Sequence, residues 1–453
     1  MNPQESAVLA RDLRETVPVI DAATGIYYHT REGQRIIDGC GGSAVACLGY
    51  QNPRVQNAIT AQMERVPYCH SQFFTTAASE DLATAIIATT ENKMAKFLAL
   101  SSGSEAMEVA MKLARQYFLE LPVPQPQRTK FISRQPSYHG ATLSTLSLGG
   151  HLSRRAPFEP LLSPGHGKVS QCNAYRGMVS GECVEDYVSR LAAELDHEFG
   201  KTPPGTVCAF VAETITGAST GCVVPVPGYW PAIEAVCRRH GALLILDEIM
   251  CGMGRTGTMH AWQQEGVVPN IQAVGKSLGG GYVPVSGVLI DHEISQTLRA
   301  GSGVLSHGQS FQAHPVACAA ALAVQRVISD EHLLDNVTKM GHLLGRALET
   351  RLGSHPHVGN IRGRGLFWAV EFVSDKVAKR TFPPARNVGP SICKFAAQPP
   401  YNISVYPGKG TADGIYGDHV LLAPAYVVNA EEIELIVNAL AGAIFQFFSG
   451  ENI

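Results

Sequence analysis

The chain has 453 residues, of which 45% are hydrophobic and 17% are charged, and 36 Lys and Arg residues oppose 39 Asp and Glu residues. This composition excludes a disordered or collagen-like chain. The formal net charge of −3 provides no bulk attraction to nucleic acid or to an anionic membrane. At roughly 100–200 residues per domain, the length allows two to four domains of a globular, enzyme-sized protein.

Eleven cysteines are scattered along the chain without a C-x-x-C spacing. This pattern favours small buried thiols in a reducing compartment over a disulfide framework or a metal site. The N-terminal segment MNPQESAVLARDLRETV lacks the apolar core of a signal peptide, and the longest wholly apolar stretch, 316–324, is about half as long as a membrane span. We therefore expect a cytoplasmic protein with no metal, membrane or nucleic-acid partner.

Residues 1–50 contain frequent glycines and strand-like turns, and GCGGSAVACLGYQNP (39–53) is an example. From about residue 95 to 330, short β-rich runs then alternate with helix-like stretches such as 104–120 and 227–241. The expected strands are 96–100, 130–133, 207–212, 242–246, 271–274 and 285–290. They show little polar alternation, which is typical of strands buried on both faces of a parallel sheet.

Residues 331–453 begin with a helical pattern, continue through RGRGLFWAVEFV (362–373) and a Pro-rich loop, and end in another helix. The apolar stripe expected on that last helix comprises Ile433, Ile436, Val437, Leu440, Ile444 and Phe447. Strand–helix alternation predicts an α/β fold with a mostly parallel sheet. We expect a large domain over 61–330 and a small α+β domain assembled from 1–60 and 331–453.

Two glycine-rich segments resemble nucleotide-binding motifs. GMGRTG (252–257) has the G-x-G-x-x-G spacing, but DEIMC separates it from the preceding strand, and the next strand ends at Lys276 instead of an acid. GKS (275–277) follows Asn270 where a P-loop requires Gly. An NAD-dependent oxidoreductase built on GMGRTG is the alternative from a different enzyme class.

Polar groups follow four expected strands: SSGSEA (101–106), SYHG (137–140), Asp247-Glu248 and Gly275-Lys276. Taken singly, they have ordinary explanations as a helix cap, a packed aromatic pair, a solvated turn and a surface lysine. In an open parallel sheet, however, ligands bind beyond the carboxyl ends of the strands. Small residues at a helix N-terminus suit a phosphate. An Asp and a Lys at neighbouring strand ends suit a pyridoxal-type cofactor.

From about residue 25 onward, the chain resembles the class III aminotransferases, which are pyridoxal-phosphate (PLP) enzymes of fold type I. Six motifs stand in the family's order: SSGSEAMEVAMKLAR, SYHG, AETITG, LLILDEIMCGMGRTG, VGKSLGGGYVPVSGVL and SHGQSFQAHPVACAAALA. The resemblance implies an aminotransferase that moves an amino group from an amine or amino acid to a keto acid or aldehyde. A PLP-dependent racemase or aminomutase is the nearest alternative because it shares the machinery of the first half-reaction.

The resemblance also implies residue roles. Lys276 holds the cofactor as a Schiff base and then moves a proton, Asp247 pairs with the ring nitrogen, and Glu213 is a further acid near the cofactor. The implied cofactor-binding residues are the phosphate cup Ser102, Gly103 and Ser104, the ring-stacking Tyr138 with His139, Ile249 on the other ring face, and Ser310, which reaches the phosphate of a neighbouring subunit. Ser310 therefore implies a homodimer with shared active sites.

Departures from the family pattern bear on the substrate. Thr214 and Thr216 stand where the family commonly has Pro and Gln. Met250 stands where many γ-amino-acid enzymes have Gln, so the chain is closer to the amine:pyruvate, or ω-transaminase, branch.

That branch captures the α-carboxylate with an Arg close to the position of Gly414, and no Arg occurs within TADGIYGDHVLLAPAY (411–426). The alternatives are replacement by Lys409, replacement by an Arg from elsewhere such as Arg54, and a different mode of carboxylate recognition. Tyr68, Phe73 and Phe74 are expected to line the substrate pocket or, alternatively, to pack in the core.

Overall fold

The computed structural model describes residues 7–9 and 11–450 and contains three β-sheets. The largest has seven strands in the order β4-β10-β9-β8-β7-β5-β6. Their bounds are β4 (Met94–Leu100), β5 (Lys130–Gln135), β6 (Gly167–Ser170), β7 (Val207–Glu213), β8 (Leu243–Asp247), β9 (Ile271–Val274) and β10 (Ser286–Asp291). Neighbours from β9 to β6 pair in parallel, while β10 runs antiparallel to β4 and β9. The expected α/β class and mostly parallel sheet are confirmed.

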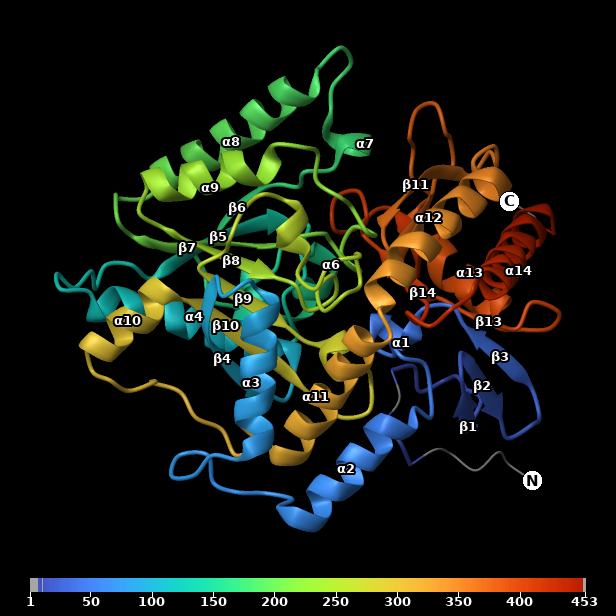
Figure 1. Ribbon diagram of the computed structural model, residues 1–453. Coiled ribbons are helices and arrows are strands. Elements are labelled where there is room, and N and C mark those ends of the chain that lie inside the picture. The colour runs from blue at the N-terminus through green and yellow to red at the C-terminus, as the bar shows by residue number, and fades with distance from the viewer. Residues whose placement is uncertain (1–6, 10, 451–453) are drawn as a thin grey trace.

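Helices cover both faces of this sheet because successive side chains of a strand point to opposite faces. Leu243 and Ile245 of β8 pack in the cluster that contains α4 (Gly103–Glu120) and α10 (His292–Ala300). Leu244 and Leu246 pack instead with α8 (Val184–Gly200) and α9 (Tyr229–Arg239). Figure 1 shows α8 and α9 together above the sheet.

The second and third sheets contain strands from both ends of the chain. β1 (Ile20–Thr24), β2 (Tyr27–Thr30) and β3 (Arg35–Asp38) form an antiparallel sheet, and β13 (Ile403–Ser404) adds in parallel to β3. In Figure 1 these blue strands lie beneath the red C-terminal elements. The pairing supports a small domain built from both termini, and its boundaries at residues 60 and 331 stay predictions.

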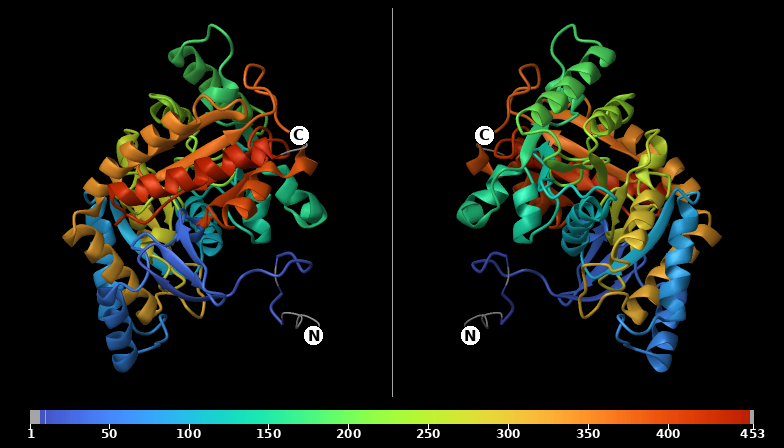
Figure 2. Two further views of the ribbon diagram at one scale, coloured as in Figure 1. Left: turned by 90° about the vertical axis from the view of Figure 1, so that its right-hand side faces the viewer. Right: turned by 90° about the vertical axis from the view of Figure 1, so that its left-hand side faces the viewer.

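The third sheet is antiparallel, with β11 (Val358–Arg364), β12 (Phe367–Phe372), β15 (Asp418–Leu422) and β14 (Tyr406–Lys409) in that order. Helices α12 (Leu333–Leu352) and α14 (Ala430–Ser449) run side by side in Figure 2, and α13 (Val388–Ala396) packs on α14. The expected apolar stripe of α14 is buried except at Phe447, which is partly buried. Although α14 is long and apolar enough to span a membrane, this packing makes it a core helix.

Three long helices, α2 (Pro53–Arg65), α3 (Ala77–Thr89) and α11 (Pro315–Asp330), pack on one another beside the large sheet. The remaining short helical segments are α1 (Gly41–Ala44), α5 (Leu143–Leu148), α6 (Leu152–Arg155), η1 (Ala156–Leu161), α7 (Ala174–Gly177), η2 (Ala261–Gln264), η3 (Lys276–Leu278) and η4 (Pro384–Arg386).

The glycine-rich GMGRTG segment joins the end of β8 to the C-terminal sheet. Arg255 is fully buried, stacks 4.5 Å from the centroid of the Tyr426 ring, and donates to the carbonyl oxygens of Leu366 and Pro424. The segment leads only to the short η2, whereas a dinucleotide fingerprint opens a helix directly after its strand. The NAD-dependent alternative is therefore wrong, and the motif has a structural role.

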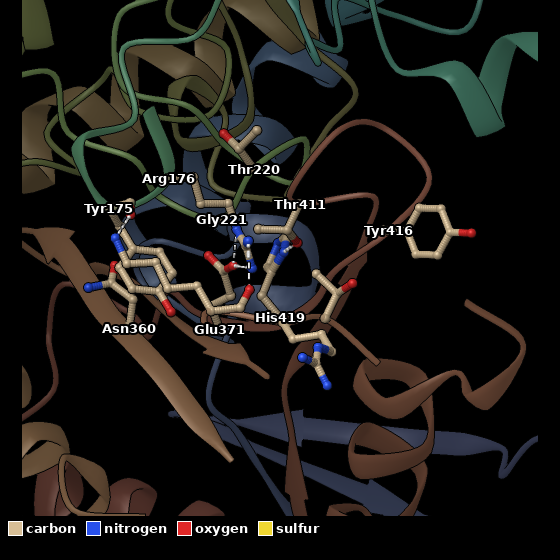
Figure 3. A network of polar contacts seen from close by, with 12 residues as sticks. Tyr175, Arg176, Thr220, Gly221, Asn360, Glu371, Thr411, Tyr416 and His419 are labelled. Atoms are coloured by element: carbon tan, nitrogen blue, oxygen red, sulfur yellow. Dashed lines mark hydrogen bonds and ion pairs between the residues drawn. The ribbon is translucent and has the colours of Figure 1, made fainter. Parts of the chain in front are cut away.

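A second polar joint lies beneath the loop that follows β7 (Figure 3). The fully buried carboxylate of Glu371 on β12 forms ion pairs with Arg176 of α7 and with Arg362 of β11. Arg362 also donates to the carbonyl oxygens of Thr220 and Gly221. The joint thus connects the C-terminal sheet to the segment that carries the predicted acid Glu213.

We expect Glu371→Gln to destabilise the protein by about 3 kcal/mol, because removing one partner of a buried ion pair leaves the others buried without a counter-charge. Thermal unfolding monitored by circular dichroism should show a midpoint several degrees lower. Glu434→Gln, at an exposed position on α14, is the matched control and should leave the midpoint unchanged. A midpoint for Glu371→Gln equal to that of the control would show that the joint contributes no stability.

Candidate active site

A cavity of about 320 Å³ lies at the carboxyl ends of β7, β8 and β9 and the N-terminus of α4. It is lined by all the predicted site residues except Ser102 and Ser310, namely Gly103, Ser104, Tyr138, His139, Glu213, Asp247, Ile249 and Lys276. Because the carboxyl ends of parallel strands meet at one edge of a sheet, residues up to 173 positions apart in the sequence reach one cavity.

Asp247 ends β8 and is held in place from two sides. Its Oδ2 accepts a hydrogen bond from His139 Nδ1 at 2.9 Å, and its Oδ1 accepts one from the Ile249 N–H at 3.1 Å. Both side chains of the His139–Asp247 pair are buried. The buried carboxylate is therefore oriented toward the cavity, where it can stabilise a cationic ring nitrogen.

Lys276 follows β9 in a left-handed backbone conformation, with φ of 47°. This conformation is uncommon for residues other than glycine and is enriched at functional sites. Burial lowers the pKa of the Lys276 amine below its ordinary value of 10.5, and the charges of Asp247 and Glu213 oppose that shift. A lysine with a lowered pKa supplies the neutral amine that nucleophilic chemistry requires.

Glu213 ends β7 and is also buried. Its carboxylate accepts hydrogen bonds from the Gly217 N–H and the Ser219 hydroxyl, each at 2.8 Å. Of the described residues, no arginine pairs with this carboxylate; Arg134 donates instead to the Glu213 backbone carbonyl. Glu213 therefore faces the cavity as an acid fixed by its own loop.

The N-terminus of α4 opens into the cavity with the geometry that a phosphate cup requires. Within the described chain, the backbone N–H groups of Gly103 and Ser104 have no hydrogen-bond partner, as is usual in the first turn of a helix. A Cβ on Gly103 would lie 3.0 Å from Ile249 Cγ2, so this position requires glycine to keep the cup open. Ser104 Oγ accepts from the Ala141 N–H at 3.0 Å and ties the cup to the SYHG segment.

The structure places two predicted residues outside the cavity. The Ser102 hydroxyl accepts from the Glu105 N–H at 3.3 Å in a capping box, so its side chain caps α4. Ser310 is exposed on the loop before α11, as a residue that acts on another subunit would be. Ser102 and Ser310 both match the family motif in sequence, but in this chain neither side chain lines the cavity.

Several lining residues carried no signal in the sequence analysis. Ser43 and Val45 come from the first 60 residues, and Tyr406 begins β14. Arg154 lies on α6 and enters the cavity beside Tyr138. These residues are missed because they reach the cavity through the packing of the two terminal segments on the large sheet, which strand-end patterns do not describe.

The departures at 214, 216 and 250 have different consequences. The Thr214 hydroxyl donates to buried Glu248, and the Thr216 hydroxyl accepts from Thr220 and from the Val223 N–H, so both stabilise the loop. Met250 lines the cavity and presents an apolar surface there. Asp247 and Glu248 are both buried, so the solvated-turn alternative is wrong.

Two sets of residues expected at the substrate site lie outside the cavity of this chain. Arg54 lies on α2 and forms ion pairs with Asp330 and Glu331. It does not line the cavity. Tyr68, Phe73 and Phe74 line neither the cavity nor the core, because they are 46%, 71% and 67% exposed. Lys409 does not line the cavity either, although it lies in an adjoining one.

The donor set fits pyridoxal phosphate. One cavity combines a lysine whose pKa is lowered by burial, a buried and oriented carboxylate, an aromatic face at Tyr138 and the open first turn of α4. These groups match the needs of the aldehyde, the ring nitrogen, the ring and the phosphate, respectively. The site therefore defines a PLP-binding enzyme.

Comparisons with known proteins give the family. The sequence matches Aminotransferase class-III over residues 8–444. It is 50% identical to an "Aminotransferase" of Gibberella zeae over 91% of this chain and 81% of that one, and 34% identical to "Gamma aminobutyrate transaminase 2" of Solanum lycopersicum over 94% and 91%. An amine transaminase from an uncultivated Pseudomonas species, solved in its PLP-bound form, superposes with a TM-score of 0.89 at 30% identity over 98% of both chains.

The chain belongs to the class III aminotransferases and is a PLP-dependent transaminase of fold type I. It is also similar to the ω-transaminase of Pseudomonas jessenii, with a TM-score of 0.88 at 32% identity over 96% of this chain and 94% of that one. The expected family, enzyme class and cofactor are confirmed.

The lowered pKa of Lys276 predicts how the apo-protein takes up PLP. Only the neutral amine attacks the cofactor aldehyde, and a pKa below 10.5 means that the neutral form predominates at lower pH. The rate of covalent attachment should therefore rise with pH and level off at a lower pH than for an ordinary lysine amine. Borohydride trapping over a pH series measures this rate, with Nα-acetyl-lysine as the reference amine; a plateau shared by both would contradict the prediction.

Proposed function

We propose that Lys276, Asp247 and Glu213 are the catalytic residues of this transaminase. Bound PLP supplies an electron-withdrawing ring that acidifies the Cα–H of the attached substrate. The Lys276 amine takes the proton from substrate Cα and returns it, because no other lysine of the described chain lines the cavity. Asp247, oriented by His139, keeps the ring nitrogen protonated, and Glu213 orients polar groups near the ring.

The remaining predicted residues bind the cofactor. Gly103 and Ser104 hold its phosphate through first-turn N–H groups, and Ser102 contributes by capping the helix that carries them. Tyr138 and Ile249 lie against the two ring faces. The single observation that carries the proposal is the convergence of Lys276, the His139–Asp247 pair and the N-terminus of α4 on one cavity.

The donor is a primary amine or an amino acid, and the acceptor is a keto acid or an aldehyde. The similarity to a γ-aminobutyrate transaminase and an amine transaminase supports this range of donors, and the apolar surface of Met250 supports placement near the ω-transaminase branch.

The test is to incubate the holoenzyme with an amino donor alone. A transaminase converts stoichiometrically to its pyridoxamine form, and the absorbance of the lysine-bound cofactor disappears. A racemase or aminomutase retains that absorbance while the donor changes configuration or constitution. Retention of the absorbance with every member of a panel of amines, ω-amino acids and α-amino acids would contradict the proposal.

We also propose a homodimer with shared active sites. Tyr68 and Phe311, the residue after Ser310, are both exposed with ring centroids 6.3 Å apart, and Phe73 and Phe74 are exposed as well. Exposed apolar patches of this kind are typical of protein interfaces. Light scattering should give twice the chain mass, and Ser310→Ala should weaken PLP binding; an active monomer would contradict the proposal.

A cytoplasmic location is the last part of the proposal. It is supported by the eleven cysteines, none of which forms a disulfide. Fractionation of cells that express the tagged chain tests it, and recovery in a membrane-bounded compartment would overturn it.

A further inference from the structure

Arg154 is a cation without a counter-charge at the edge of the active-site cavity. It lies on α6 and lines the cavity that contains Lys276 and Asp247. Its guanidinium carbon is 4.5 Å from the centroid of the Tyr138 ring. Along the described chain, no carboxylate forms an ion pair with Arg154, and no carbonyl accepts a hydrogen bond from its side chain.

The neighbouring Arg155 shows what a structural arginine does at this place. Its guanidinium donates to the carbonyl oxygens of Ser147 and Gly149 at 2.6 and 2.7 Å, and to Glu159 at 3.1 Å. Its donors are used within the fold. Those of Arg154 remain available to a ligand, apart from the contact of its face with Tyr138.

The surroundings of Arg154 favour a negatively charged ligand. A second cavity of about 910 Å³ adjoins the first and shares with it Tyr138, Gly140, Arg154 and Tyr406. Arg11 and Lys409 also line this outer cavity, and none of its lining residues is Asp or Glu. A cleft lined by one sign of charge concentrates ligands of the opposite sign.

Asp413 lies in the loop after β14, and its carboxylate already accepts hydrogen bonds from the backbone of that loop. Its Oδ1 accepts from the N–H groups of Ile415 and Tyr416 at 2.8 and 2.7 Å. Lys409 donates to Asn387, a neutral partner, and so keeps its charge. Arg11, Arg154 and Lys409 therefore give the outer cavity a cationic lining.

The backbone fixes Arg154 in this position. The Ser153 N–H donates to the Gly414 carbonyl at 3.1 Å, and His151 Nε2 donates to the Lys409 carbonyl at 2.8 Å, so α6 and the residue before it are tied to the end of β14 and to the loop that follows it. Gly414 has φ of 93°, and a Cβ there would lie 2.9 Å from the Leu152 nitrogen. Position 414 is thus closed to any side chain, and among the described residues Arg154 supplies the only guanidinium that lines the active-site cavity.

We propose that Arg154 is a specificity-determining residue that binds the carboxylate of the substrate. The substrates of this enzyme are accordingly amino acids and oxo acids, which enter through the cationic outer cavity. The planar guanidinium forms two parallel hydrogen bonds with a carboxylate. This inference rests on the proposed transaminase function and names the substrate class of that same site.

The experiment compares each amino acid with its own primary amide, which has the same shape but no charge, as donors for the holoenzyme. For the best ω-amino or α-amino acid, Arg154→Met should lower kcat/KM about 100-fold, mainly through KM, since a charge-assisted bidentate pair is lost. Activity with the amide should stay within about twofold of wild type. Arg154→Lys keeps the charge and should fall between the two. Arg299→Met, at an exposed site on α10, is the control.

Two results would overturn the proposal: an equal loss for acid and amide in Arg154→Met, or a wild-type enzyme that prefers the amide. Binding of unreactive carboxylates, such as butanoate, to the wild-type and Arg154→Lys holoenzymes gives a second measurement if Arg154→Met does not fold. Equal dissociation constants would again overturn it. Failure of the transaminase proposal looks different, because the wild-type cofactor absorbance would then persist with every donor.

Discussion

Lys276→Ala should abolish transamination while leaving the fold intact. The alanine side chain can neither form the covalent bond to the cofactor nor move the proton at substrate Cα. General acid–base catalysis alone contributes about 10²–10⁴-fold, so we expect kcat to fall by at least about four orders of magnitude. Steady-state turnover with the best donor measures this loss, and the spectrum of the purified variant should lack the lysine-bound cofactor band.

The control for Lys276→Ala is Lys339→Ala, which removes an exposed lysine on α12 and should retain wild-type activity. Borohydride reduction followed by peptide mapping should place the cofactor on residue 276 in the wild type and in this control. Turnover by Lys276→Ala within tenfold of wild type would require another lysine to bind the cofactor.

Asp247→Asn should lower kcat about 1,000-fold, in the range found when one preorganised electrostatic partner of a transition state is removed. The amide has nearly the shape of the carboxylate but carries no charge, so the ring nitrogen loses the partner that keeps it protonated. The hydrogen bonds at 2.9 and 3.1 Å from His139 and Ile249 would be formed with an amide, whose NH₂ group also opposes one of these donors.

A cofactor analogue methylated at the ring nitrogen separates the electronic effect from a structural one. Its ring is permanently cationic, so it should restore part of the activity of Asp247→Asn but not that of Lys276→Ala. Asp335→Asn, at an exposed site on α12, is the control and should behave as wild type. A near-normal rate for Asp247→Asn with native PLP would mean that another group protonates the ring.

The sequence predicts most of the large sheet because its central strands are buried on both faces. Runs such as 207–212 and 242–246 have no polar interruption, and they match β7 and β8 within one residue. β6 was missed because it is a short edge strand, GKVS, with a partly exposed, polar composition. The pairing of β3 with β13 was also beyond local patterns, since the partners lie more than 360 residues apart.

Site residues that lie at or next to the end of a strand could be predicted from the sequence, whereas residues farther from a strand end could not. Asp247 and Lys276 directly follow or end their strands, so the sheet alone determines where they meet. Arg154 and Tyr406 depend on how α6 and β14 pack against the large sheet, which involves contacts such as that of Ser153 with Gly414. The order of the motifs therefore predicted the residues proposed to be catalytic. The residues proposed to select the substrate depend on tertiary packing and could not be predicted in this way.

The left-handed backbone of Lys276 has a consequence for the balance between activity and stability. A residue other than glycine in this conformation costs about 1–3 kcal/mol, and a buried amine adds a desolvation cost. Glycine at position 276 would relieve both, so the apo-protein would gain about 1 kcal/mol of stability while losing its chemistry. Selection for fold stability alone would thus remove this lysine. The enzyme keeps Lys276 for its chemistry at a cost in the free energy of folding.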